Sequence, residues 1–204
     1  MKKDVIQQTK AFVYQRFQHD STGHDYAHME RVAKMSHYIA KKEDADPFLA
    51  EIAGWLHDVA DSKLTDDPKQ AEVELRSFLE SLYLTEEQIT VIMSAIETVS
   101  FRKGKQPNSV IGQVVQDADR LDAIGAIGIA RAFSFGGNRE NTIYSESSEQ
   151  KNQSTIQHFY DKLLRLKDQL HTNTAKQIAK ERHLYMEGFL NQFFQEWDFL
   201  KKDE

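Results

Sequence analysis

Apolar side chains recur every three to four positions along most of the chain, the spacing that places them on one face of an α-helix. A first helix is expected at about residues 3–18, where Val5, Phe12, Val13 and Phe17 share a face. The strict alternation of apolar and polar residues that indicates strands is scarce. Further helices are expected to begin near His24, Pro47, Asp66, Thr85 and Ser109. The pattern predicts an all-α fold, a compact helical bundle.

Several of these expected helices carry recognisable start signals. Asp25 is placed to cap the second helix, which is expected to run to about Lys42. Pro47 suits the first turn of the third helix. Thr85-Glu86-Glu87-Gln88 has the spacing of a capping box for a helix that reaches about Val99. Another helix is expected from Ser109 through Gly125.

The periodic pattern breaks at residues 134–153, which contain Gly136-Gly137 and a run rich in Ser, Glu and Asn. A break this long is expected to be a mobile loop. Two long helices are then expected within residues 154–202. The aromatic residues of the last helix, Phe189, Phe193 and Trp197, keep a helical register and predict either a core face or a homodimer face.

Composition narrows the class of protein. A chain of 204 residues fits one domain, residues 1–204. The formal net charge of −6 argues against a nucleic-acid or anionic-membrane binder. There is no cysteine, so neither a disulfide nor a thiolate metal site can form. The N-terminus shows no apolar signal core, and the expected location is the cytoplasm.

Four polar residues stand among apolar neighbours on the expected helices: His28, the adjacent pair His57-Asp58, and Asp119. Burying imidazole and carboxylate groups is costly unless they find partners, and a divalent cation suits both. Two imidazoles and two carboxylates form a mixed N/O set that suits an octahedral ion better than structural zinc. We expect one divalent metal ion, Mn²⁺ as the first candidate, with Mg²⁺, Fe²⁺, Co²⁺ or Ni²⁺ as alternatives. Each residue alone would more often be a hydrogen-bonded core residue or a helix cap.

The ordered set His28, His57-Asp58, Asp119 resembles the HD-domain metal-dependent phosphohydrolase superfamily, which is named for its adjacent His-Asp pair. Over about residues 20–140 the chain is similar to a bacterial subfamily of small stand-alone members, in the segments His24-Asp25-x-x-His28-x-x-Arg31-Val32, Leu56-His57-Asp58-x-x-Asp61-Ser62-Lys63, Val99-Ser100-Phe101 and Asp117-Ala118-Asp119-Arg120-Leu121-Asp122-Ala123-Ile124-Gly125. The resemblance implies an all-helical bundle, one metal held by these four ligands, and hydrolysis of a phosphate ester or anhydride, commonly in a nucleotide. Residues 62–118 contain no histidine, which argues against the binuclear members of the superfamily.

Three further residues are candidate catalytic groups. Asp61, one turn beyond the His-Asp pair, is placed to orient or deprotonate the attacking water; the alternative is a solvated carboxylate that pairs with Lys63. Lys63 could neutralise a phosphate oxygen or simply be a surface lysine. His24 precedes His28 by one turn and could donate a proton, unless it is part of the helix cap.

Asp122 could orient a ligand imidazole or pair with an arginine.

Arginines are the expected substrate-binding residues, because the guanidinium group matches phosphate geometry. The candidates are Arg31, Arg102, Arg120 and Arg139. Lys103 and Lys105, beside Arg102, are more simply explained as solvated loop residues. Arg139 follows Gly136-Gly137 and could arrive on the mobile loop.

These features predict a metal-dependent phosphohydrolase that acts on a small-molecule nucleotide by direct attack of water. The favoured activity is a nucleoside triphosphate pyrophosphohydrolase, which releases monophosphate and pyrophosphate. Two alternatives stay open: a nucleoside 5′-monophosphate phosphatase, and a non-catalytic HD module that senses nucleotides. A nuclease would need a continuous basic groove, which the acidic balance disfavours.

Overall fold

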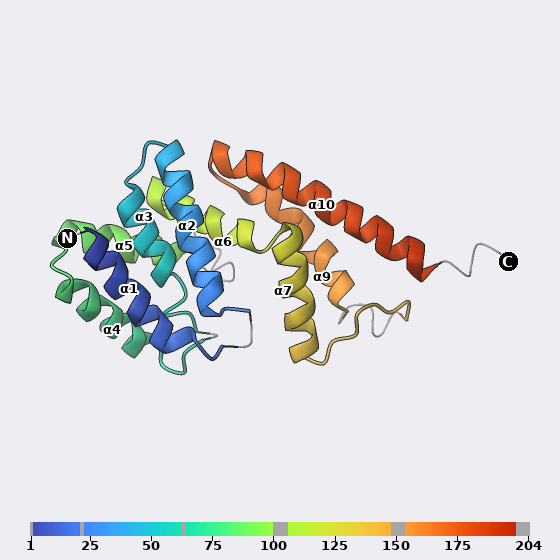
Figure 1. Ribbon diagram of the computed structural model, residues 1–204, viewed down its shortest axis with the longest axis horizontal. Coiled ribbons are helices and arrows are strands. Elements are labelled where there is room, and N and C mark those ends of the chain that lie inside the picture. The colour runs from blue at the N-terminus through green and yellow to red at the C-terminus, as the bar shows by residue number, and fades with distance from the viewer. Residues whose placement is uncertain (1, 21–22, 63, 100–105, 148–153, 199–204) are drawn as a thin grey trace. The chain divides into compact units, whose positions relative to one another are not determined.

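The computed structural model describes residues 2–20, 23–62, 64–99, 106–147 and 154–198, and over these ranges the protein is all-α, as predicted (Figure 1). The chain divides into two compact units. The first unit comprises Met1–Arg120 and His171–Ala175, and the second comprises Leu121–Leu170 and Lys176–Glu204. None of the described helices is both long enough and apolar enough to cross a membrane.

The first unit is built around one central helix. Its helices are α1 (Lys2–Phe17), α2 (Tyr26–Lys42), α3 (Pro47–Leu56), α4 (Pro68–Ser81), α5 (Glu86–Val99) and α6 (Val110–Asp122), of which α6 belongs to this unit as far as Arg120. Helix α3 packs against α1, α2 and α5, and α4 packs against α5 (Figure 1). Ile52 and Leu56 of α3 are completely buried, and each such side chain contributes roughly 2 kcal/mol by leaving water.

The start signals in the sequence act as expected. The Asp25 side chain accepts a hydrogen bond from the backbone N–H of His28 at 2.8 Å, which caps α2. Pro47 stands in the first turn of α3, and Asp46 caps that helix by accepting from the N–H groups of Phe48 and Leu49. In the capping box before α5, the Thr85 hydroxyl accepts from the Gln88 N–H, and the Thr85 N–H donates to the Gln88 side chain.

Helices α2 and α3 approach closely at Gly54. A Cβ atom at this position would lie 2.8 Å from the backbone Cα of Ala33 and 2.8 Å from the hydroxyl of Ser36. Real Cβ atoms do not come so near to other atoms, so glycine is what allows the two helices to pack at this distance. The contact lies in the last turn of α3, immediately before the His-Asp pair.

The second unit contains α7 (Gly125–Asn138), α9 (Thr155–Asp161), the 3₁₀ helix η2 (Leu163–Gln169) and α10 (Asn173–Trp197), which belongs to this unit from Lys176 onward. Helix α7 packs against α9, which packs against η2. The rings of Phe133, Phe159 and Phe189 meet with centroids 5.9 to 6.0 Å apart and form part of its core. Phe189 of the last predicted helix therefore contributes to a core face, whereas Trp197 is 46% exposed.

Three sequence-based boundaries were wrong. The helix expected to continue through Gly125 ends at Asp122, and α7 begins at Gly125, whose φ of 78° is a conformation that favours glycine. Residues 134–138 are the last residues of α7 rather than the start of a loop. The first closing helix is short, because α9 ends at Asp161 and η2 follows. Whether residues 1–204 act as one domain, and whether the segment after Asn138 is mobile, stay predictions.

Candidate metal centre

His28 reaches the centre from the first turn of α2. Its side chain is completely buried, and the Asp25 cap fixes the turn that carries it. The flanking Met29 and Val32 are also completely buried, so this face of α2 is anchored in the core. The burial of an imidazole beside these apolar side chains requires a polar partner on its open side.

His57 and Asp58 lie immediately after α3. His57 is the C-cap residue of the helix, and its Nδ1–H donates to the carbonyl oxygen of Gly54 at 2.8 Å. This hydrogen bond leaves the Nε2 lone pair for the other side of the ring. The close packing at Gly54 brings the rings of His57 and His28 to a centroid distance of 5.2 Å.

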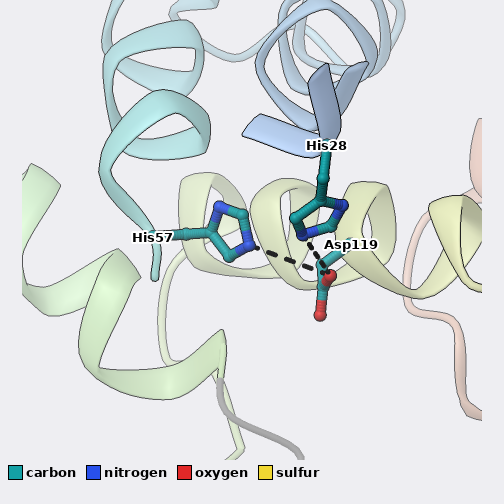
Figure 2. A group of neighbouring side chains, drawn as sticks. All are labelled: His28, His57 and Asp119. Atoms are coloured by element: carbon teal, nitrogen blue, oxygen red, sulfur yellow. Dashed lines mark ion pairs between the residues drawn. The ribbon is translucent and has the colours of Figure 1, made fainter. Parts of the chain in front are cut away.

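Asp119 completes the group from α6. Val115 and Ala118 on that helix are completely buried, and they hold the helix against the rest of the unit. The Asp119 carboxylate keeps 32% of its side chain exposed and lies 3.5 Å from Nε2 of His28 and 3.8 Å from Nε2 of His57. Figure 2 shows the two imidazole rings directing a nitrogen each toward this carboxylate. The centre is therefore buried on the histidine side and open beside Asp119.

Asp58 contacts the same two nitrogens. Its Oδ2 lies 3.3 Å from Nε2 of His57 and 3.7 Å from Nε2 of His28. Burial alone would lower the pKa of His57, but the carboxylates of Asp58 and Asp119 outweigh burial and raise that pKa to about 9. Burial alone would raise the pKa of Asp58, but His57 and His28 hold it well below its ordinary value.

His28, His57 and Asp119 form a group that could hold a divalent metal ion, and Asp58 contacts the same two imidazole nitrogens. Ligand atoms of His28, His57 and Asp119 all lie within 4.8 Å of one another. The carboxylate oxygens of Asp58 and Asp119 lie 3.3 to 3.8 Å from the histidine Nε2 atoms. In an octahedral site with bonds of about 2.1 Å, neighbouring ligand atoms are roughly 3 Å apart and opposite ones roughly 4 Å apart, so the observed distances fall in the range expected around one ion. Nε2 of His57 is buried without a hydrogen bond among the described residues. A cation would satisfy that nitrogen and replace the proton between the ring and the carboxylates.

Asp61 lies close to the His-Asp pair. Its backbone N–H donates to the Asp58 carbonyl at 3.1 Å, and its side chain is mostly buried, with a residue exposure of 9%. Asp61 and His57 both line a cavity of about 170 Å³. The structure therefore places Asp61 near one of the candidate metal ligands, and its role in catalysis stays a prediction. Lys63, the other predicted member of this turn, lies outside the described residues.

His24 and two of the predicted arginines are in the same unit. The His24 ring packs edge to face on the ring of His28, with centroids 5.7 Å apart, although His24 precedes the helix rather than forming its first turn. Arg31 is half-buried one turn after His28. Arg120 is half-buried next to Asp119; burial lowers its pKa, and Asp117 and Asp119 oppose that effect.

The three remaining predicted residues lie outside the part of the first unit that the structure describes. Arg102 lies outside the described residues. Arg139 belongs to the second unit, where its guanidinium lies over the ring of Phe135 at 5.4 Å. Asp122 accepts a hydrogen bond from Arg131 at 2.9 Å, which is the structural alternative that the sequence left open.

The sequence analysis did not identify a buried hydrogen-bond network around Asp117, close to Asp119 in the chain. The completely buried carboxylate of Asp117 accepts hydrogen bonds from the backbone N–H groups of His171 and Thr172 and from the Thr172 hydroxyl, at 2.8 to 3.1 Å. The Gln116 side chain accepts from His171 and donates to the carbonyl of Thr98. His171 and Thr172 are more than fifty residues from Asp117 in the chain, so no local pattern could have revealed these contacts.

Comparisons with known proteins agree with this geometry. Residues 25–124 match the family model described as the HD domain. YpgQ of Bacillus subtilis (strain 168) is 41% identical over 190 residues, which cover 91% of this chain and 90% of YpgQ. A crystal structure of YpgQ in complex with ADP superposes with a TM-score of 0.82 at 39% identity, covering 94% of this chain and 97% of that one.

A crystal structure described as an HD-superfamily hydrolase from Bacillus thuringiensis superposes with a TM-score of 0.81 at 38% identity. It covers 97% of this chain and 99% of that chain. The matched family region contains His28, His57, Asp58 and Asp119. The chain therefore belongs to the HD-domain superfamily of metal-dependent phosphohydrolases.

Proposed function

We propose that this protein hydrolyses nucleotides and, more narrowly, that it converts nucleoside triphosphates to monophosphates and pyrophosphate. The observation that carries the proposal is the buried N/O donor set of His28, His57, Asp58 and Asp119, which opens to solvent beside Asp119. The presence of ADP in a structure of YpgQ supports a nucleotide as the ligand. The basic residues that the sequence places at 102–105, which are Arg102, Lys103 and Lys105, favour a long phosphate chain over a monophosphate.

The protein's own residues account for the remaining chemistry. A divalent ion held by the four ligands would polarise a phosphoryl oxygen and lower the pKa of a water molecule. The Asp61 carboxylate accepts a hydrogen bond from the attacking water, orients it in line with the leaving group and receives its proton. Arg120 and Arg31 bind phosphoryl oxygens and offset the negative charge that develops on them. Mn²⁺ is the proposed ion, because the donor set mixes nitrogen and oxygen.

The deciding experiment is turnover by metal-stripped protein after addition of Mn²⁺, Mg²⁺, Co²⁺ or Ni²⁺. The substrates are nucleoside mono-, di- and triphosphates and a generic phosphomonoester, with phosphate and pyrophosphate assayed separately. We expect metal-dependent release of pyrophosphate from triphosphates that disappears in Asp58→Ala. The matched control is Asp66→Ala, which removes an exposed carboxylate near the start of α4 and leaves turnover intact.

The released anion distinguishes the alternatives. Phosphate released from monophosphates, with no pyrophosphate from triphosphates, would make the protein a 5′-nucleotidase. A metal bound by the four ligands without turnover of any substrate would support the nucleotide sensor.

A further inference from the structure

The hydrogen-bond network around Asp117 reaches Arg120 through the ring of His171. Nε2 of His171 lies 2.6 Å from Oε1 of Gln116 and 3.2 Å from Nη1 of Arg120. Gln116 and Arg120 are one turn apart on α6, and all three residues belong to the first unit. Arg120 directly follows the candidate ligand Asp119, whose carboxylate opposes the effect of burial on the pKa of Arg120. His171 therefore contacts an arginine that lies near the candidate metal centre.

The backbone of His171 is held without any help from its ring. The buried Asp117 carboxylate accepts from the N–H groups of His171 and Thr172, at 2.8 to 3.1 Å. The Thr172 hydroxyl donates to the same carboxylate at 2.8 Å and accepts from the Ala175 N–H at 3.3 Å. Hydrogen bonds to an ionised acceptor are among the stronger ones in proteins. The segment thus fixes where the His171 ring begins, and the ring can be replaced while these backbone contacts remain.

The partners of Gln116 determine which nitrogen of His171 carries a hydrogen. Gln116 is 2% exposed, and its Nε2 donates to the carbonyl oxygen of Thr98 at 2.6 Å. A carbonyl oxygen only accepts, so the amide nitrogen faces Thr98 and the amide oxygen faces His171. The amide oxygen also only accepts, so Nε2 of His171 must donate to it. A nitrogen that carries a hydrogen has no lone pair for Arg120, so the ring stands against the guanidinium group without accepting from it.

We propose that His171 positions Arg120 for phosphate binding. Its ring restricts the conformations of the guanidinium group, and its commitment to Gln116 prevents it from competing with a phosphate for the N–H groups of Arg120. Ordering a long side chain during binding costs affinity, and a neighbour that orders it beforehand reduces that cost. His171 acts through Arg120 and is a positioning residue. The assignment rests on the proposed function in taking Arg120 as a phosphate-binding residue.

A double-mutant cycle separates this role from a general effect on folding. The probe is ADP, and its affinity for the Mn²⁺-loaded protein is measured by calorimetry. We expect His171→Ala to weaken ADP about three- to tenfold, the usual cost of ordering one long side chain. Arg120→Ala should weaken ADP about tenfold or more, as expected for hydrogen bonds to a charged group. In the Arg120→Ala background, His171→Ala should change the affinity less than about 1.5-fold, because its effect passes through the arginine.

Two further variants serve as matched controls. His171→Gln places an amide N–H where Nε2–H lies and should restore ADP affinity to within about twofold of the wild type. Thr172→Val removes two hydrogen bonds of the same segment but keeps the ring. It should lower the urea midpoint of unfolding while ADP affinity stays within about twofold. Weakening by Thr172→Val as large as that by His171→Ala would assign the effect to the segment and overturn the role of the ring.

Nitrogen-15 NMR of the His171 ring tests the hydrogen assignment directly, with His171→Gln identifying its signals. We expect the hydrogen on Nε2. A ring with its hydrogen on Nδ1 alone would overturn the proposal, because Nε2 would then accept from Arg120. Absence of ADP binding by the wild type, or equal weakening by His171→Ala with and without Arg120, would overturn it as well. The expected coupling without hydrolysis of any triphosphate would refute the pyrophosphohydrolase activity and retain the role of His171.

Discussion

Metal binding at this centre should expel one proton from His57. In the metal-free protein the carboxylates of Asp58 and Asp119 raise the pKa of His57 to about 9, so this ring is protonated at neutral pH. A metal ion needs the neutral ring, because the Nε2 lone pair forms the bond. The hydrogen bond from Nδ1–H to Gly54 persists in both states and keeps Nε2 directed at the centre.

The magnitude follows from the pKa. At pH 7, two units below it, about one ring in a hundred is neutral, and displacing the proton costs about 2.7 kcal/mol. The apparent dissociation constant of the metal should therefore fall about tenfold for each unit of pH between 6 and 8. The metal-free protein should show the complementary trend. The pKa of His57 is higher in the folded than in the unfolded chain, so its contribution to stability is complete below pH 6.5 and is lost as the pH rises through 9.

Isothermal titration with Co²⁺ or Mn²⁺ in buffers of different ionisation enthalpy measures both quantities. We expect about one proton released per metal ion at pH 7, and less than half a proton in His57→Gln. His37 is the matched control, because it is an exposed histidine paired with Glu51 at 3.0 Å. His37→Gln should leave the proton count and the affinity unchanged.

A dissociation constant that stays constant from pH 6 to 8, with no proton released, would refute the reasoning. It would mean that the imidazole is already neutral beside the two carboxylates. Proton release that persists in His57→Gln would assign the proton to another group.

Three further predictions concern catalysis and folding. Asp61→Asn should lower kcat of metal-dependent hydrolysis by about 10²–10⁴ while metal affinity measured by calorimetry is retained; equal loss of both would make Asp61 a ligand rather than a base. Gly54→Ala should cost about 1–3 kcal/mol in urea unfolding and weaken metal binding, because its Cβ meets Ala33 at 2.8 Å, whereas Gly188→Ala enters open space and should not destabilise. Asp117→Ala should cost about 2–3 kcal/mol by leaving the donors of Thr172 without an acceptor, and a loss below 0.5 kcal/mol would show that water replaces the carboxylate.

Local sequence signals determined where helices α2, α3 and α5 begin. Asp25, Pro47 and the Thr85–Gln88 capping box act on N–H groups within three residues, so the sequence alone identified them correctly. The sequence also predicted that His28 and His57 are buried, because the spacing of apolar residues around each of them indicates which side of the segment packs into the core. The ordered His, His-Asp and Asp set was recognisable as a family pattern before any geometry was known.

Tertiary structure decided what depends on residues that are distant in the chain. The spacing of the metal ligands depends on the close approach of α2 and α3 at Gly54 and on the placement of α6, and neither appears in a local pattern. Leu75 of α4 lines the same cavity as Met93 and Ile96 of α5, and the Asp117 carboxylate accepts a hydrogen bond from the Thr172 N–H. Hydrophobic periodicity specifies which face of a helix is buried but not which other helix covers it, because burial by any apolar partner gains a similar free energy.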